Sequence, residues 1–207
     1  TKKTMHSVDK QKIAHGFNKA AGNYNAQAKI QHDIAHEGLS RLEAMMHASA
    51  DCALDIGCGT AISTARLTNI ATRVIGLDIS FNMLKPATHD HQMRAQLKAQ
   101  NIKESPFCAI NADAESLPLL SQSVDVVYSS MALQWCQTPK KVVNEINRVL
   151  RPKGKALLCI LTGESFMELQ NGWQHLNLPS RVNNFHHHEL WLDAAKNTGS
   201  KVQHTTK

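Results

Sequence analysis

The residues of this chain best suited to chemistry are two glycines and an acid that follows them. Residues 51–61 read Asp-Cys-Ala-Leu-Asp-Ile-Gly-Cys-Gly-Thr-Ala, so Gly57 and Gly59 come directly after a short apolar run. A second apolar run ends in Asp78, 21 residues after Gly57. Glycine has no Cβ, so a ligand can approach its backbone closely, and a carboxylate can accept hydrogen bonds from both hydroxyls of a ribose. The order of strand, glycine turn, helix, strand and acid predicts a βαβ unit that handles a nucleotide.

The spacing of the glycines argues against a dinucleotide site. A dinucleotide-binding turn reads Gly-x-Gly-x-x-Gly, and Ile62 stands here at the place of the third glycine. The close packing of helix on strand that the third glycine permits is therefore lost. A nucleotide-dependent oxidoreductase is accordingly disfavoured, and a βα turn that binds no ligand is the structural alternative.

The elements that must position these residues alternate along the chain from residue 51. Such alternation predicts an α/β fold, a mostly parallel sheet with helices on both faces. The expected strands are 52–56, 73–78, 106–110, 124–128 and 155–161, and the expected helices are about 61–69, 81–99 and 138–150. Ligands of such sheets bind at the carboxyl ends of the strands, near the point where strand order reverses. The polar residues expected there are Asp55, Asp78, Asp113 and Ser129.

Two residues near these strand ends have the chemistry to hold an adenine. Asp113 would accept a hydrogen bond from the exocyclic amine. Met83, early in the helix after Asp78, would lie flat on the ring, although methionine is equally suited to filling a gap in the core.

The first 46 residues show helical spacing. Ile13, Phe17, Ala20, Tyr24 and Ala28 recur at steps of three and four, as on one face of a helix, and Ser7 is the expected N-cap. Gly22-Asn23 interrupts the pattern, so two helices that meet near residue 22 are expected. Residues 1–48 are predicted to form a helical lid, and residues 49–207 the nucleotide-binding part of what is a single domain overall.

Composition narrows the class of protein. The five cysteines are odd in number, scattered and never in a Cys-x-x-Cys pair, which favours free thiols in a reducing cytoplasm over a zinc site. No apolar run approaches the roughly 20 residues that span a membrane, and the N-terminus lacks the apolar core of a signal peptide. The net charge of +6 suits an acidic partner, although most lysines need do no more than solvate the surface. The chain has no aromatic-and-basic stretch of the kind that binds nucleic acid. The adjacent residues His186, His187 and His188 point in different directions, so no metal site is expected.

Several motifs resemble those of class I S-adenosylmethionine-dependent methyltransferases, which have a Rossmann-like fold. These motifs are the turn at 55–60, the run 74–84 that contains Asp78 and Met83, and residues 113–118. A narrower resemblance, to the malonyl-[acyl-carrier protein] O-methyltransferase family of biotin synthesis and its trans-aconitate methyltransferase relatives, comes from Ala132-Leu-Gln-Trp135. The N-terminal pattern at 17–28 and the segments after Arg151 favour the biotin family.

This resemblance implies methyl transfer from S-adenosylmethionine to the free carboxylate of a malonyl thioester, leaving S-adenosylhomocysteine. It implies that Asp55, Gly57 and Gly59 hold the methionine end of the cofactor, that Asp78 holds the ribose, and that Asp113 with Ala114 holds the adenine. Further cofactor contacts are expected at Ile79, Met83 and Ser129. Tyr24 on the lid would close over the acceptor, and Gln134 and Trp135 would line the acceptor pocket, with no general base and no metal. The implied partner is an acidic acyl-carrier protein that docks on the basic N-terminal lysines, and a monomer is the expected state.

Two departures from the family pattern leave alternatives open. Ala61 stands where the family's turn has a glycine, and its methyl is tolerable in helical backbone but damaging at positive φ. The sequence also stops at Lys207, before a further helical segment and a closing strand, so the C-terminal strand pair is expected to be incomplete. A methyltransferase for another acceptor (a small carboxylic acid like trans-aconitate, a quinone or a tRNA base) and an inactive, truncated paralogue that only binds cofactor are the competing hypotheses.

Overall fold

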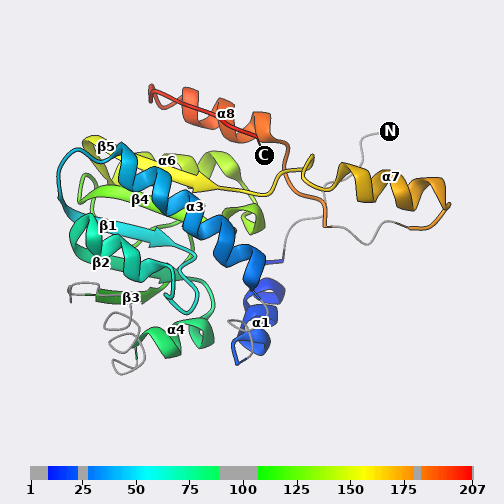
Figure 1. Cartoon of the computed structure of the whole chain (residues 1–207), viewed down its shortest axis with the longest axis horizontal. Helices are drawn as coiled ribbons and strands as arrows, with labels where there is room; N and C mark the ends of the chain where they lie inside the picture. Colours follow the sequence, from blue (N-terminus) through cyan, green and yellow to red (C-terminus); the bar gives the residue numbers. More distant parts are fainter. Residues whose placement is uncertain (1–8, 23–27, 89–106, 180–182, 207) are drawn as a thin grey trace.

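A single parallel sheet organises the computed structural model, which describes residues 9–22, 28–88, 107–179 and 183–206 (Figure 1). Its strands are β1 (Ala50–Ile56), β2 (Ala71–Asp78), β3 (Phe107–Asn111), β4 (Val124–Ser130) and β5 (Leu150–Cys159). The spatial order is β3-β2-β1-β4-β5, and every pairing is parallel. Strand order reverses between β1 and β4, so the carboxyl ends of these two strands mark the place where a ligand is expected.

Helices cover both faces of the sheet, as the sequence predicts. On one face, α3 (Lys29–Met45) packs through Leu39 and Leu42, and the hydroxyl of Tyr128 on β4 donates to Ala35 O at 2.9 Å. On the other face, α6 (Pro139–Val149) and α8 (His188–Lys196) enclose a second core that includes Trp191. The central strand β1 is buried on both sides because successive side chains alternate between these two cores.

The sheet is clamped at its amino ends by Asp125 near the start of β4. One carboxylate oxygen of Asp125 accepts the backbone N–H groups of Asp51 and Cys52 on β1, at 3.0 and 2.9 Å. The guanidinium of Arg151 on β5 donates to both oxygens of the same carboxylate at 2.9 Å. Three neighbouring strands are thus tied together through one side chain.

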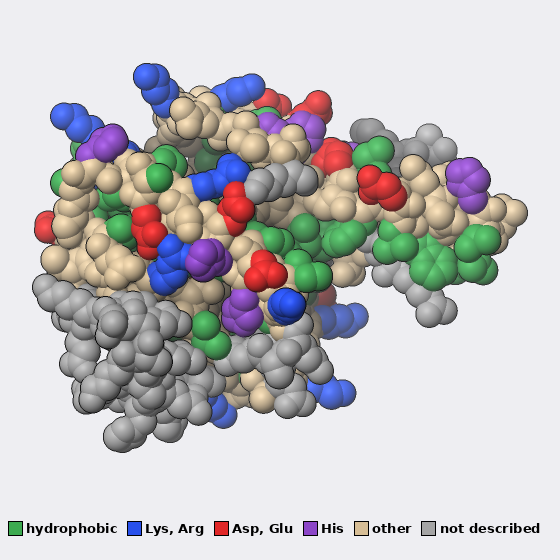
Figure 2. Space-filling view, in the orientation of Figure 1, with side chains coloured by type: hydrophobic (Ala, Val, Ile, Leu, Met, Phe, Trp, Pro, Cys, Tyr) green, Lys and Arg blue, Asp and Glu red, His purple; other side chains and the backbone are tan. Residues whose placement is uncertain are grey.

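The remaining elements surround the carboxyl ends or extend away from the sheet. The 3₁₀ helix η1 (Thr64–Asn69) follows the glycine turn, α4 (Phe81–Thr88) follows β2, and the short η2 (Leu133–Trp135) follows β4. The helix α1 (Lys10–Ala20) lies beside the carboxyl ends, and α7 (Met167–His175) projects from the body of the molecule (Figure 1). Hydrophobic side chains gather on and just after α7 at the surface (Figure 2), where Met167, Leu169, Leu176 and Leu178 are exposed.

Several predicted boundaries need correction. Only a 3₁₀ helix, starting at Thr64, occupies the predicted helix 61–69, because the turn continues through residue 63. Strand β5 begins at Leu150 rather than 155, since the Pro152–Gly154 stretch is accommodated by a register shift against β4 and by a positive φ at Lys153. The predicted helix 81–99 is seen to residue 88, and its remainder lies outside the described residues.

The two predicted N-terminal helices are present, with Gly22 between them. The cap of the first is Asp9, whose carboxylate accepts the N–H groups of Gln11 and Lys12, rather than Ser7, which lies outside the described residues. The helix α3 belongs to the predicted lid of residues 1–48, yet it packs directly on the sheet. The division of the chain into a lid and a nucleotide-binding part near residue 48 stays a prediction. Among the helices formed by described residues, none combines the length and the apolar character needed to cross a membrane.

Candidate functional site

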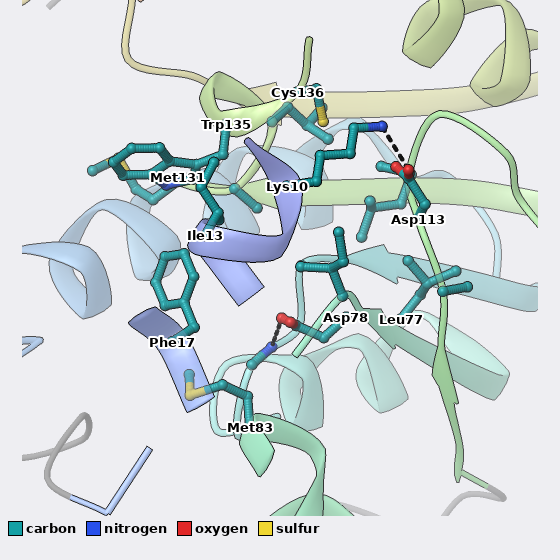
Figure 3. A pocket seen from close by; sticks show the side chains of 18 of the residues that line it. Lys10, Ile13, Phe17, Leu77, Asp78, Met83, Asp113, Met131, Trp135 and Cys136 are labelled. Atoms are coloured by element: carbon teal, nitrogen blue, oxygen red, sulfur yellow. Dashed lines mark hydrogen bonds and ion pairs between the residues drawn. The ribbon is translucent and has the colours of Figure 1, made fainter. Parts of the chain in front are cut away.

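A cavity that is partly open to solvent lies at the carboxyl ends of the strands beneath α1 (Figure 3). The turn after β1, the residues after β2 and β3, and the segment 130–136 after β4 form its walls, and α1 forms its cover. Its position at the reversal of strand order and its mostly apolar lining with a few polar groups both suit a small-molecule ligand.

The glycine turn presents bare backbone to this cavity. Gly57 and Gly59 both have positive φ, +77° and +55°. Gly57 N–H donates to Leu77 O at 2.6 Å, which holds the turn against β2. A Cβ built on Gly57 would lie 2.1 Å from Cβ of Ala132, so no other residue fits there without displacing the segment after β4.

Ala61 has a positive φ, the conformation in which a methyl group at this position is expected to be damaging. Its φ is +61°, it is buried, and its N–H donates to Cys58 O at 2.9 Å. An L-residue in this left-handed region costs about 1–2 kcal/mol, because Cβ approaches the carbonyl oxygen. The turn therefore keeps the geometry that glycine favours and carries the strain of a methyl group.

Asp78 connects the glycine turn to α4 across the wall of the cavity (Figure 3). One carboxylate oxygen accepts Gly59 N–H at 2.9 Å and the other accepts Ser80 N–H at 2.7 Å. Burial raises the pKa of Asp78, while these backbone hydrogen bonds act to lower it. A carboxylate offers about four acceptor positions, so Asp78 keeps capacity to accept from a ligand beside these backbone donors.

Asp113, the acid predicted to bind an amine, is already paired with a cation (Figure 3). Nζ of Lys10 lies 2.5 Å from Oδ2 of Asp113 and also bonds to Glu115, whose other oxygen accepts Thr138 N–H at 2.5 Å. Burial acts to lower the pKa of Lys10, but its hydrogen bonds to the two acids, with their charges, raise it overall. Lys10 is therefore an exception to the expectation that most of the lysines solvate the surface.

The rest of α1 is held over the cavity by an aromatic contact and by one asparagine. The rings of Phe17 and Trp135 meet edge to face with centroids 6.1 Å apart, and Phe185 meets the other side of Trp135 at 5.4 Å. At the end of the helix, Oδ1 of Asn18 accepts Ser80 Oγ–H at 2.7 Å and Asn82 N–H at 2.9 Å.

Three predicted site residues are buried beside the cavity without bordering it. Asp55 is only 3% exposed, accepts Thr64 Oγ1–H at 2.6 Å, and has its pKa raised to about 7 by burial. Ser129 donates to Ile56 O at 2.6 Å. Gln134 donates through Nε2 to Met131 O at 2.7 Å, while its Oε1 is buried without a partner among the described residues.

The remaining predicted site residues either border the cavity or lie outside the described residues. Gly57, Gly59, Asp78, Ile79, Met83, Asp113, Ala114 and Trp135 border the cavity. Tyr24 lies outside the described residues. Sequence reasoning missed Lys10 as a lining residue, although Lys10, Ile13 and Phe17 share the three- and four-residue spacing that identified the helix face.

Among the described residues, one cysteine borders the cavity, and the histidines of the run 186–188 make other contacts. Cys136 borders the cavity, and burial raises its pKa to about 12, which keeps the thiol protonated. His187 pairs with Glu164 at 2.7 Å, and His188 stacks on His204. No group of three or more histidine, cysteine, aspartate or glutamate side chains could hold a metal ion within residues 9–22, 28–88, 107–179 and 183–206.

Sequence comparisons relate this geometry to proteins of known activity. The sequence model of a family described as a methyltransferase domain matches residues 54–158. The chain is 34% identical over 190 residues to the malonyl-[acyl-carrier protein] O-methyltransferase of Pectobacterium atrosepticum, covering 91% of this chain and 68% of that enzyme. It is 34% identical over 179 residues to the biotin biosynthesis bifunctional protein BioHC of Cellvibrio japonicus, covering 86% of this chain. The chain spans 33% of that protein's length, and 59% of the corresponding Methylovorus methyltransferase.

Solved structures with the same fold are more distant in sequence. The [4+2]-cyclase SpnF superposes with a TM-score of 0.70 at 16% identity, covering 95% of this chain and 75% of that one. A phosphoethanolamine N-methyltransferase of Haemonchus contortus, solved with S-adenosylhomocysteine, gives a TM-score of 0.59 at 22% identity, covering 79% of this chain and 36% of that one. The fold predicted from the sequence is confirmed, as is the resemblance carried by the motifs.

Proposed function

Since the chain belongs to the family of methyltransferase domains, we propose that it transfers a methyl group from S-adenosylmethionine to the free carboxylate of malonyl-[acyl-carrier protein]. The product would be the methyl ester that primes pimelate synthesis for biotin. The observation that carries the proposal is the convergence of Gly57, Asp78 and Asp113, from three neighbouring strands, on one cavity. The named relatives supply the acceptor.

The residues around the cavity fit this cofactor. The positive-φ glycines leave room for its methionine portion to lie against bare backbone. The carboxylate of Asp78 borders the cavity and would accept a hydrogen bond from the ribose, and Ile79 and Met83 offer an apolar surface to the adenine. Asp113 would accept a hydrogen bond from the adenine amine.

For this methyl transfer, the main task of the protein would be to align the acceptor carboxylate with the methyl group. S-adenosylmethionine supplies the electrophilic methyl group when bound. The acceptor carboxylate is ionised at neutral pH, so no general base is required. Trp135 and Phe17, which border the cavity, would orient the acceptor and exclude water from its carboxylate.

The direct test is methyl transfer from labelled cofactor to malonyl-[acyl-carrier protein], compared with binding of S-adenosylhomocysteine by calorimetry. Asp78→Asn should lower the affinity for S-adenosylhomocysteine by about 10-fold or more, because its amide nitrogen accepts no hydroxyl hydrogen bond. Asp51→Asn is the matched control, since the Asp51 side chain is 75% exposed and remote from the cavity.

Each result decides between the candidate functions. Transfer to malonyl-[acyl-carrier protein] above that to small carboxylic acids such as trans-aconitate would support the proposal. Preference for a small acid would replace the acceptor and retain the reaction class. Binding without transfer to any acceptor would indicate a cofactor-binding paralogue, and a folded chain that binds no S-adenosylhomocysteine would overturn the assignment.

A further inference from the structure

Lys10 links α1 to two acids that lie more than 100 residues away in the sequence. Its ammonium bridges Asp113 and Glu115, and the side chains of Lys10 and Glu115 are only 22% and 7% exposed. Glu115 is also fixed from the other side by Thr138 N–H. The negative charge of Glu115 is thus largely removed from water and compensated by a cation that belongs to the cover of the cavity.

The helix that carries Lys10 depends on its contacts with the rest of the protein. It has eleven residues and none of them is buried. A helix of this length is marginal in water when isolated. The three attachments of α1 described above, at Lys10, Phe17 and Asn18, therefore determine whether it stays closed and helical.

The carboxylate of Asp113 has two prospective partners. One oxygen already accepts Glu115 N–H at 2.9 Å and the other is taken by Lys10. An adenine amine that reached Asp113 would approach the same side chain, in a cavity that α1 partly covers. The closing contact and the ligand contact therefore share one acid.

We propose that Lys10 is a latch that holds α1 over the cavity through Asp113 and Glu115 and yields Asp113 to the amine of the arriving cofactor. This inference rests on the proposed function, because it assigns the adenine to Asp113. Lys10 acts as a positioning residue: it slows opening of the empty site and leaves the reacting atoms untouched. Since Glu115 still binds Lys10 after Asp113 is taken, α1 can close again over the bound cofactor.

Hydrogen–deuterium exchange of the α1 amides in the ligand-free protein tests the latch directly. We expect Lys10→Met to speed exchange about 5-fold, the factor that corresponds to one ion pair of about 1 kcal/mol. Lys12→Met on the same helix is the matched control, because Lys12 is 86% exposed and pairs only with Asp9 in the described part of the chain. Lys10→Arg should restore slow exchange.

Two further comparisons keep the test decisive. Glu115→Gln removes the buried charge but keeps an acceptor for Thr138 N–H, and it should also speed exchange. Raising the salt concentration from about 0.05 to 0.5 M should speed exchange only slightly in the wild type, because the partly buried pair is screened less than an exposed one, and should leave Lys10→Met unchanged. Equal exchange of α1 in wild type and Lys10→Met, both with cooperative thermal melts, would overturn the latch.

The kinetics of S-adenosylhomocysteine binding complete the test. We expect association with Lys10→Met to be about 5-fold faster than with the wild type, and dissociation to change less, because the empty protein no longer has to release the latch. Unchanged or slower association would contradict the shared use of Asp113. Failure of both proteins to bind S-adenosylhomocysteine would overturn the proposed function, while the exchange data would still decide whether Lys10 holds α1.

Discussion

The backbone at Gly57 and the side chain of Ala132 approach so closely that a methyl group added to Gly57 would lie 2.1 Å from Cβ of Ala132. The two residues come from the turn after β1 and the segment after β4, which meet at the reversal of strand order. Any side chain at position 57 would therefore displace the segment after β4, and both segments border the cavity.

Gly57→Ala should therefore impair both stability and binding. We expect a loss of about 2–5 kcal/mol in the free energy of unfolding, from overpacking and a positive φ together, and no measurable binding of S-adenosylhomocysteine. Urea unfolding and calorimetry measure the two effects. Gly172→Ala is the control, since a Cβ there meets nothing within 4 Å. Equal stability of Gly57→Ala and wild type would show that the turn can rearrange.

Ala61→Gly should stabilise the protein, because glycine removes the strain at φ +61°. We expect the melting temperature to rise by about 2–4 °C, which corresponds to about 1 kcal/mol for a chain of this size. Ala65→Gly, in η1 and also buried, should lower it instead. Destabilisation of both variants would mean that Ala61 is not strained.

Asp55→Asn should flatten the pH dependence of stability. The pKa of Asp55 is about 7 in the folded chain against 3.8 for an ordinary aspartate, so the folded state binds the proton more tightly than the unfolded state. Acidification from pH 8 to pH 5 should thus stabilise the wild type relative to Asp55→Asn, on the order of 2 kcal/mol. A residual slope is expected in the variant, because burial also raises the pKa of Asp78. Urea unfolding at each pH measures the effect. An equal change in the free energy of unfolding between pH 8 and pH 5 in the wild type and in Asp55→Asn would contradict the prediction.

Trp135 should matter more for the acceptor than for the cofactor. Its two edge-to-face contacts, with Phe17 and Phe185, place it between α1 and the C-terminal segment. Trp135→Leu should raise KM for the acceptor about 10-fold, while Trp135→Phe keeps most of the aromatic contact and most of the activity. The affinity for S-adenosylhomocysteine should change little in either variant. If the variants lost more affinity for the cofactor than for the acceptor, Trp135 would serve the cofactor, and the prediction would be wrong.

The exposed lysines of α1 provide a test of carrier-protein docking. Lys12 and Lys19 are exposed, unlike Lys10, and lie on the cover of the cavity. If the proposed carrier-protein partner has an acidic surface, Lys12→Glu with Lys19→Glu should slow transfer to malonyl-[acyl-carrier protein] severalfold and leave transfer to a small malonyl thioester unchanged, because the small thioester has no such surface to dock. Equal slowing of methyl transfer to both acceptors would contradict the proposed docking surface.

Much of the site follows from local sequence pattern. Asp78 ends one apolar run and Asp113 closely follows another, which places these acids at adjacent strand ends, since parallel strands present their carboxyl ends at one edge. The inward direction of Asp55 is harder to anticipate. It depends on which face of β1 meets η1, and thus on the pairing with Thr64. Neither the ion pair of Lys10, which joins residues 103 positions apart, nor the sign of φ at Ala61 is encoded in a local pattern.

The clamp at Asp125 has a consequence for how the molecule can vary. It fixes three strands at the edge opposite the cavity, so the anchoring of the sheet does not depend on the turns that face the ligand. The amino ends of the strands hold the sheet together, and the carboxyl ends carry the ligand site. Sequence changes in α1 leave these strand contacts in place, whereas changes at Asp125 or Arg151 remove a contact between strands without touching a residue that borders the cavity.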